Sequence, residues 1–258
     1  MRSWYHTIDL PDGTATPGYF ETRSSPKYIP WPREIQGARC LDVGTFDGFW
    51  AFEMERRGAR EVIAVDLADP HALDWPYDTE ISGPQKVVEW GSERKRGFAD
   101  LSATLSSHAQ WIDQSVYDLS PERNGTFDVV FCGALLLHLR DPIRALEAMR
   151  SVCTASLVLA EEIEPKLEVL APVIPAILVG KRVDQWYRPN SNALRALVDK
   201  AGFTVQEMGP RYVVPFGTAA AATGARPPLL NTILSRRRGG AAGVLCRALR
   251  ATPRPRRG

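Results

Sequence analysis

The stretch "LDVGTFDGFW", residues 41–50, decides the fold of this chain. An apolar run leads into a loop that holds two glycines, Gly44 and Gly48, and an amphipathic segment begins directly after it. Glycines allow the positive backbone angles that a tight turn between a buried strand and a helix needs. The stretch therefore predicts the strand, glycine loop and helix of an α/β sheet of the nucleotide-binding type.

The same alternation continues along the chain. Apolar runs without polar alternation predict strands buried on both faces, and amphipathic segments between them predict helices. The expected strands are residues 38–44, 61–67, 109–116, 127–134, 155–163, 204–209 and 211–217, and the expected helices are 48–59, the second half of 85–107, 141–153 and 189–203. The last two strands lie too close for a crossover helix, so they predict an antiparallel hairpin. We expect an α/β fold, a Rossmann-like doubly wound sheet of about seven strands, mostly parallel with an antiparallel C-terminal β-pair.

Composition divides the 258 residues into three parts. Residues 1–36 predict a lead-in or cap, residues 37–215 the main domain with a lid-like insertion at 165–190, and residues 216–258 a basic tail. The net charge is +2, but ten arginines lie at or after Arg211 and no acid follows Glu207, so the body of the chain is net acidic. Such an end predicts either contacts with RNA phosphates or a solvated, partly disordered terminus, and we favour the second.

The composition also excludes several classes of protein. No run approaches the ~20 apolar residues of a transmembrane helix, and the first residues lack the apolar core of a signal peptide. The four cysteines, at positions 40, 132, 153 and 246, are widely spaced and form no CxxC pair. We expect a cytoplasmic protein with no membrane contact and no bound metal.

The glycine loop differs from the loop that binds dinucleotides. That fingerprint needs GxGxxG, whereas Phe46 replaces the middle glycine, no third glycine follows at the required spacing, and Asp47 adds a negative charge. These features favour a cofactor with positive charge and no phosphate, such as S-adenosyl-L-methionine (SAM). Asp42 would face its sulfonium and ammonium groups, and Asp66 would accept hydrogen bonds from both ribose hydroxyls.

Five stretches, taken in order, resemble the class I SAM-dependent methyltransferases over roughly residues 37 to 215: "CLDVGTFDGFW", "VIAVDL", "SVYDL", "FDVVFCGALLLHLRDPIRAL" and "LVDKAGF". "GALLLHLRDP" and the N-terminal "WYHTIDLPDGTATPG" are similar to the branch that contains the bacterial tRNA wobble-uridine carboxymethyltransferases and their small-molecule relatives. The resemblance implies SAM as cofactor and S-adenosyl-L-homocysteine as product.

The resemblance also assigns positions in the cofactor site. Adenine recognition would fall to Ser115 and Val116, with Asp118 as an alternative, and the backbone of Cys132 and Gly133 would pass under the methyl donor. The implied cofactor set is Asp42, Gly44, Thr45, Phe46, Asp47, Gly48, Asp66, Leu67, Ser115, Val116, Cys132 and Gly133.

The sequence gives fewer signals for the residues that bind the methyl acceptor or take its proton. His138, beyond the fourth strand, is either the general base or a structural residue, and Glu161 and Glu162 are alternatives. His6 would reach the pocket only if the N-terminal segment folds over it, and His108 is less favourably placed. Substrate contacts are expected from Tyr19, Glu162, Trp186 and Tyr187; the insertion that carries the last two predicts either a pocket wall or a dimer contact.

Three functions stay open at this point. The first is a methyltransferase that modifies an O, N or C nucleophile of a small molecule, with a homodimer possible and nucleic acid a less favoured partner. The second is a tRNA wobble-uridine (carboxy)methyltransferase, which would need a cation such as Lys27, Arg33 or Arg188 to hold an extra carboxylate. The third is a non-catalytic SAM-binding module.

Overall fold

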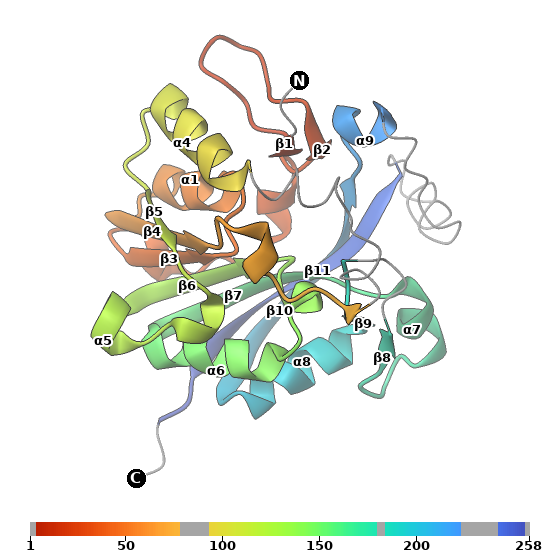
Figure 1. Ribbon diagram of the computed structural model, residues 1–258. Coiled ribbons are helices and arrows are strands. Elements are labelled where there is room, and N and C mark those ends of the chain that lie inside the picture. Colours follow the sequence, from red (N-terminus) through yellow and green to blue (C-terminus); the bar gives the residue numbers. More distant parts are fainter. Residues whose placement is uncertain (1–3, 78–92, 180–183, 223–241, 256–258) are drawn as a thin grey trace.

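The computed structural model describes residues 4–77, 93–179, 184–222 and 242–255, arranged around one central sheet (Figure 1). Within these residues, seven strands form the sheet in the order β10-β11-β7-β6-β3-β4-β5. They are β3 (Arg39–Val43), β4 (Glu61–Asp66), β5 (Gln110–Asp113), β6 (Phe127–Gly133), β7 (Cys153–Glu162), β10 (Phe203–Pro215) and β11 (Gly243–Pro253). Strands β3 to β7 are parallel, and β11 pairs antiparallel with both β7 and β10. The predicted Rossmann-like α/β fold is confirmed.

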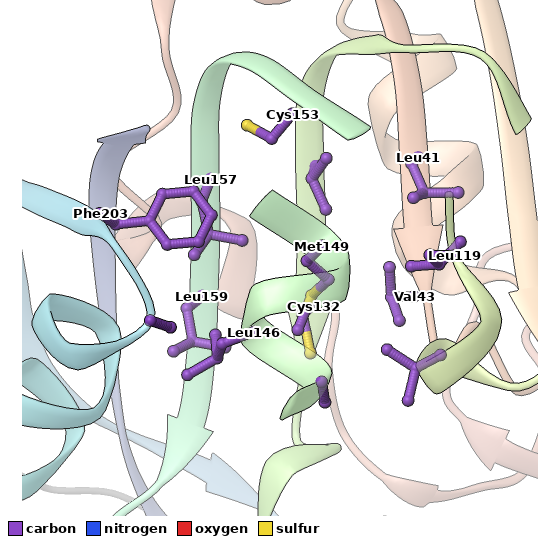
Figure 2. Close-up of a cluster of buried hydrophobic side chains, with 14 of the residues drawn as sticks. Leu41, Val43, Leu119, Cys132, Leu146, Met149, Cys153, Leu157, Leu159 and Phe203 are labelled. Carbon is purple, nitrogen blue, oxygen red and sulfur yellow. The ribbon is translucent and has the colours of Figure 1, made fainter. Parts of the chain in front are cut away.

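Helices cover both faces of this sheet. α1 (Phe49–Arg56) and α4 (Arg94–Leu105) lie on one face, and α5 (Pro121–Asn124), α6 (Pro142–Val152) and α8 (Ser191–Lys200) lie on the other (Figure 1). Successive strand residues point to opposite faces, so Cys40 joins the cluster under α1 whereas Leu41 joins the cluster under α6. Figure 2 shows the second cluster, in which Leu146 and Met149 of α6 lie close to the buried strand residues.

Local sequence signals fix the ends of these helices. The Asp141 carboxylate accepts a hydrogen bond from the Arg144 amide at the start of α6, directly before Pro142, and Asn190 caps α8 in the same way. Gly58 follows α1 with a φ of +90°, the left-handed conformation that ends many helices. Residues 85–92 of the segment 85–107 lie outside the described residues, and α4 forms over the second half as predicted.

The prediction of a C-terminal hairpin is wrong about which two segments pair. Residues 204–209 and 211–217 do not pair with each other, because β10 runs through Gly209 and Pro210 as one strand, with a shift in pairing between Met208 and Arg211. Proline has no amide to donate and is tolerated here because β10 is the edge strand of the sheet. The "GP" pair that indicated a turn is an irregularity within one strand.

The antiparallel partner of β10 is β11, which comes from the segment that we expected to be a solvated, partly disordered tail. Its arginines concealed an apolar pattern, since Val244, Leu245, Ala248 and Leu249 are buried. The guanidinium of Arg247 donates to the Gly209 carbonyl at 3.1 Å, which ties an arginine of β11 to the backbone of β10. Residues 243–253 are therefore part of the sheet.

The N-terminal segment, defined here as residues 4–25, docks on the end of β10. Its strands β1 (Trp4–His6) and β2 (Gly18–Phe20) pair in parallel, and backbone hydrogen bonds join Glu21 to Pro215 and Gly217 to Tyr19. The remaining short elements are η1 (Ser25–Tyr28), η2 (Arg33–Ile35), η3 (Pro70–Ala72), η4 (Val116–Asp118), η5 (Leu136–His138), α7 (Pro165–Leu170), β8 (Ile177–Val179), β9 (Tyr187–Pro189) and α9 (Thr218–Ala222). None of the helices in the described residues is long and apolar enough to cross a membrane.

Candidate active site

A cavity lies beyond the carboxyl ends of the parallel strands, where α/β sheets of this kind bind their ligands. We call the part at the ends of β3, β4, β5 and β6 the cofactor side; it is lined by Gly44, Phe46, Asp66, Leu67, Ser115, Val116 and Gly133. We call the part at the ends of β7, β10 and β11 the acceptor side; it is lined by Tyr19, Phe20, Glu162, Tyr212, Val214, Val244 and Cys246. The N-terminal segment therefore contributes to a cavity that the sheet alone would leave open.

The glycine loop turns tightly because three of its residues have positive φ. Gly44 (+75°) and Gly48 (+96°) flank Phe46, which adopts the same left-handed conformation at +53°. A Cβ on Gly48 would lie 2.6 Å from the Phe52 ring, so only glycine fits there. Phe46 thus supplies the backbone conformation of the glycine that it replaces, and its amide donates to an Asp66 oxygen at 2.9 Å.

Asp42 is buried in β3 behind this loop and does not line the cavity. Burial raises the pKa of its carboxyl to about 7, although Thr45 and His6 nearby lower it in part. Its Oδ2 and the Thr45 hydroxyl are both buried without a hydrogen-bond partner in the described part of the chain. A cation in the cavity would favour the ionised form of Asp42.

Asp66 ends β4 and lines the cavity, and its carboxylate accepts hydrogen bonds from protein groups. Oδ1 accepts from the Leu67 amide at 2.8 Å and from Arg94 at 2.9 Å, and Oδ2 accepts from Phe46. The Arg94 guanidinium also lies 4.7 Å from the centre of the Phe46 ring. Arg94, at the start of α4, was not anticipated from the sequence, because it lies in a run of charges that resembles a solvated helix face.

Asp47, expected at the cofactor, instead holds the N-terminal segment. Its Oδ2 accepts from the backbone amides of Tyr5 and His6, both at 2.9 Å, and its Oδ1 contacts Nδ1 of His6. Asp47 does not line the cavity, whereas Tyr5 and His6 do. The N-terminal segment does fold over the pocket, which was the condition for His6 to reach it.

Some of the other predicted cofactor residues line the cavity, and some lie behind its surface. Ser115 and Val116 line the cavity at the start of η4, together with Gln114, whereas Asp118 does not. Gly133 lines it at the end of β6, but Cys132 is fully buried in the core, where burial raises the pKa of its thiol well above the usual value. Thr45 and Gly48 shape the loop from behind the cavity surface.

His138 lines the cavity at the end of η5. Its Nδ1 contacts the backbone carbonyl of Asp184, and the Asp184 carboxylate lies 4.0 Å away. Glu161 is buried and accepts from the amides of Leu135 and Leu136 at 3.1 and 3.0 Å, so it holds the loop that carries His138. Burial raises the pKa of the Glu161 carboxyl to about 8.

Of the predicted substrate residues, Tyr19 and Glu162 line the cavity, and Trp186 and Tyr187 lie outside its lining. The indole of Trp186 donates to the Asp74 carbonyl at 2.8 Å and the Tyr187 hydroxyl donates to the Leu136 carbonyl at 2.7 Å, so both fasten the insertion to the domain. Their neighbours Asp184 and Gln185 reach the cavity instead.

The remaining residues that the sequence suggested for the site do not line the cavity. Arg188 pairs with Glu164 at 2.8 Å, Lys27 lies over the Tyr28 ring, and Arg33 belongs to η2. His108 is exposed between α4 and β5. No sequence signal near the glycine loop pointed to Tyr212, Val244 or Cys246, because their positions depend on the pairing of β10 with β11.

A family model described as a methyltransferase domain matches residues 27–208. The chain belongs to this family. The match covers β3 to β9 and the first residues of β10, and it ends before β11. The domain is a SAM-dependent methyltransferase domain, which confirms the enzyme class and the cofactor that the sequence predicted.

Among curated proteins, the methyltransferase domain is 32% identical over 126 residues to a ubiquinone biosynthesis O-methyltransferase of Xanthomonas euvesicatoria, covering 49% of this chain and 43% of that protein. It is 26% identical over 185 residues to a tRNA U34 carboxymethyltransferase of Aeromonas hydrophila, covering 69% and 48%. The chain thus spans less than half the length of these two relatives.

Among solved structures, 1,6-didemethyltoxoflavin-N1-methyltransferase of Burkholderia thailandensis, with its substrate and S-adenosylhomocysteine bound, superimposes with a TM-score of 0.53 at 15% identity. The superposition covers 85% of this chain and 72% of that one. This likeness supports the class I methyltransferase fold.

Proposed function

We propose that this protein transfers a methyl group from SAM to an oxygen or nitrogen of a small, flat, neutral or cationic acceptor, with carbon as a further possibility. The single observation that carries the proposal is the character of the acceptor side. Tyr19 and Phe20 of the N-terminal segment meet Tyr212, Val214 and Val244 of the two C-terminal strands there. Aromatic and aliphatic side chains of this kind bind a flat apolar molecule.

The residues present fit SAM, which supplies a methyl group on a positively charged sulfur. Asp66, with Leu67 beside it, would hold the ribose, Ser115 and Val116 the adenine, and the backbone of Gly44 and Gly133 the methionine part. The buried Asp42 oxygen, which has no hydrogen-bond partner among the described residues, would stabilise the positive charges from behind the loop.

The charge of the lining supports a neutral or cationic acceptor. Its described residues include four carboxylates, those of Asp66, Asp74, Glu162 and Asp184. The one guanidinium among them, that of Arg94, is paired with Asp66. Arg188, behind the lining, lies 3.9 Å from the Glu162 carboxylate and offsets its charge in part. Among the described lining residues, carboxylates still outnumber guanidinium groups four to one, which disfavours a phosphate or a second carboxylate.

A tRNA substrate and a carboxylated form of SAM are the alternative, suggested by the name of one relative. Two observations disfavour it. Lys27, Arg33 and Arg188 do not line the cavity, and Arg188 is already paired with Glu164. In the described part of the C-terminal segment, Arg211 and Arg250 form ion pairs with glutamates and the Arg254 guanidinium donates to the Phe203 carbonyl, so these arginines stabilise the fold.

The first test is a series of three catechols with the same ring and different charge: catechol, dopamine and 3,4-dihydroxybenzoate. Transfer of labelled methyl from SAM is measured for each, and for unfractionated tRNA. We expect transfer to neutral or cationic rings and none to the carboxylate or to tRNA. Preferred transfer to tRNA would replace the proposal, and SAM binding without transfer to any acceptor in a broad panel would indicate a non-catalytic module.

The cofactor assignment is tested separately by calorimetric titration of SAM. Asp66→Ala should weaken binding by at least ~1.5 kcal/mol, because it removes a charged hydrogen-bond acceptor. Asp118→Ala is the matched control, since Asp118 is exposed and lies outside the lining. Equal affinities of the two variants would remove Asp66 from the site.

Oligomeric state and compartment are further parts of the proposal. The insertion exposes apolar side chains in and around α7 and β8, namely Val169, Leu170, Val173, Ile174, Ile177 and Val179, which supports a contact surface such as a homodimer interface. All four cysteines are buried and free, which agrees with the reducing cytoplasm expected from their spacing. Analytical ultracentrifugation would measure the first and fractionation of cells the second.

A further inference from the structure

His6 and Asp47 form a buried pair at the edge of the cavity. The two side chains are 7% and 3% exposed, and Nδ1 of His6 contacts Oδ1 of Asp47. Because the other Asp47 oxygen already accepts two backbone amides, this carboxylate is held by three hydrogen bonds. An ionised carboxylate only accepts hydrogen bonds, so in the neutral imidazole the proton lies on Nδ1 and Nε2 carries the lone pair.

The orientation of the His6 ring is fixed by its neighbours. It stacks on Phe49 with centroids 5.3 Å apart and meets the edge of Tyr5 at 4.7 Å. The His6 carbonyl accepts from the Thr16 hydroxyl at 2.7 Å, which fastens the strand behind it. Nε2 makes no hydrogen bond within the described part of the chain, and His6 lines the cavity.

We propose that His6 is the general base of the methyl transfer and that Asp47 is its positioning residue. This rests on the proposed transfer to an O–H or N–H acceptor. As the acceptor atom bonds to the methyl carbon, the carbon–sulfur bond breaks and its electron pair stays on sulfur. The acceptor proton passes to Nε2 of His6, the Asp47 carboxylate stabilises the resulting imidazolium, and the proton then leaves to solvent.

His138 is less suited to this role. Its Nδ1 contacts a backbone carbonyl, the Asp184 carboxylate lies 4.0 Å from that nitrogen, and the two side chains are 32% and 21% exposed, so solvent screens this pair more than the buried pair of His6 and Asp47. His6 has a buried carboxylate as its partner. A carboxylate in that position both selects the tautomer and stabilises the protonated ring.

Among residues 4–77, 93–179, 184–222 and 242–255, few charged groups lie near His6. Asp47 contacts it directly, Asp42 of β3 lies close enough for the two side chains to interact electrostatically, and the ion pair of Arg94 with Asp66 lies beyond the Phe46 ring. The His6 ring also contacts the aromatic rings of Tyr5 and Phe49, and the His6 backbone carbonyl accepts from the Thr16 hydroxyl. Asp47 is therefore the group that selects which ring nitrogen of neutral His6 carries the proton.

Anchoring of the N-terminal segment is the competing role, and two variants separate it from catalysis. In His6→Asn the side-chain amide can still donate to Asp47, so the anchor is kept and the base is lost. In Asp47→Asn the carbonyl can still accept the two backbone amides, but the new NH₂ group donates to Nδ1 and moves the imidazole proton to Nε2. His108→Asn, at an exposed histidine, is the matched control.

The full-length protein is tested by three measurements: ¹⁵N NMR of the imidazoles, calorimetric SAM binding, and the turnover of the most rapidly methylated catechol of the charge series. We expect the wild-type His6 to carry its proton on Nδ1, its Nε2 signal to shift when catechol is added with S-adenosylhomocysteine, and Asp47→Asn to move the proton to Nε2. Both variants should lose at least ~100-fold in kcat, with SAM affinity within about threefold of wild type.

Other outcomes would overturn the inference. Turnover of His6→Asn within about threefold of wild type would exclude His6 as the base, and a large loss in His138→Asn alone would assign that role to His138. If His6→Asn lost both SAM binding and thermal stability, the result would support only a role of His6 in anchoring the N-terminal segment. If the wild type methylates no catechol, the proposed acceptor class fails, and the tautomer still tests the inference: a proton on Nε2 of wild-type His6 would leave that nitrogen no lone pair to accept a proton and would overturn it.

Discussion

The cofactor side and the acceptor side of the cavity are built in different ways. Gly44, Asp66 and Gly133 each lie at the end of a strand or in the loop directly after it, so a short stretch of sequence both forms the strand and delivers the residue. On the acceptor side, Phe20 bridges to Phe216, and Val214 of β10 pairs with Val244 of β11. Short stretches of neighbouring residues therefore determine the cofactor side. The acceptor side forms only when segments that are distant in the sequence pack against each other.

The largest effect should follow from a change that separates the two sides. A Cβ on Gly18 would lie 2.3 Å from the backbone of His6, so Gly18→Ala should prevent β1 and β2 from pairing and displace Tyr5, Tyr19 and Phe20. Transfer to catechol should fall more than ~100-fold through loss of orientation, while SAM affinity changes by less than about threefold.

Gly13→Ala is the control for this prediction, because Gly13 lies in the same segment with open space around its Cβ position, so that its φ of +83° adds backbone strain of ~1–2 kcal/mol but no overlap with β1. It should leave methyl transfer near the wild-type rate. If Gly18→Ala abolished SAM binding as well, the two sides would not be separable and the comparison would fail.

The next largest effect is expected in the glycine loop of the cofactor side, at Gly48. Gly48→Ala places a Cβ against the rings of Phe52 and Phe98 at a φ of +96°, so steric overlap adds to backbone strain. We expect a loss of ~2–4 kcal/mol in the free energy of unfolding, measured by denaturant titration. Gly37→Ala, at a φ of +73° with open space, should lose only ~1–2 kcal/mol.

This difference explains what the sequence could predict. The parallel strands, the glycine loop and the cavity position of Asp66 follow from local patterns, and those of Ser115 and Gly133 follow from the family resemblance. Asp47 lies in the same loop, yet its partners, Tyr5 and His6, are about forty positions earlier in the chain, and only the folded structure brings them together. β11 was misinterpreted because arginines that bind carbonyls and glutamates within the fold look, in a sequence, like arginines in water.

A smaller effect is expected at Glu161, at the end of β7 between the two sides. Its carboxyl pKa is about 8 in the folded protein against an ordinary value of 4.5, because of burial. As pH rises from 5 to 8 the unfolded chain loses this proton first, so folding stability falls. Glu161→Gln keeps an acceptor for the Leu135 and Leu136 amides and has no proton to lose.

Denaturant titrations at pH 5 and pH 8 check this prediction. Wild type should lose at least ~1.4 kcal/mol relative to Glu161→Gln over that interval, the equivalent of one pKa unit. A difference that stays constant with pH would mean that Glu161 is ionised in the folded protein throughout.

The smallest effect belongs to Phe46, where the two sides meet. Its left-handed backbone shapes the glycine loop, and its ring stacks on Tyr5 of the N-terminal segment with centroids 4.5 Å apart. Comparing Phe46→Gly with Phe46→Ala separates the two roles, since both remove the ring and only glycine relieves the strain. We expect the glycine variant to be the more stable by ~1 kcal/mol, the reverse of the usual preference for alanine. If alanine were the more stable, the loop would not need a positive φ at this position, and the aromatic stack alone would account for Phe46.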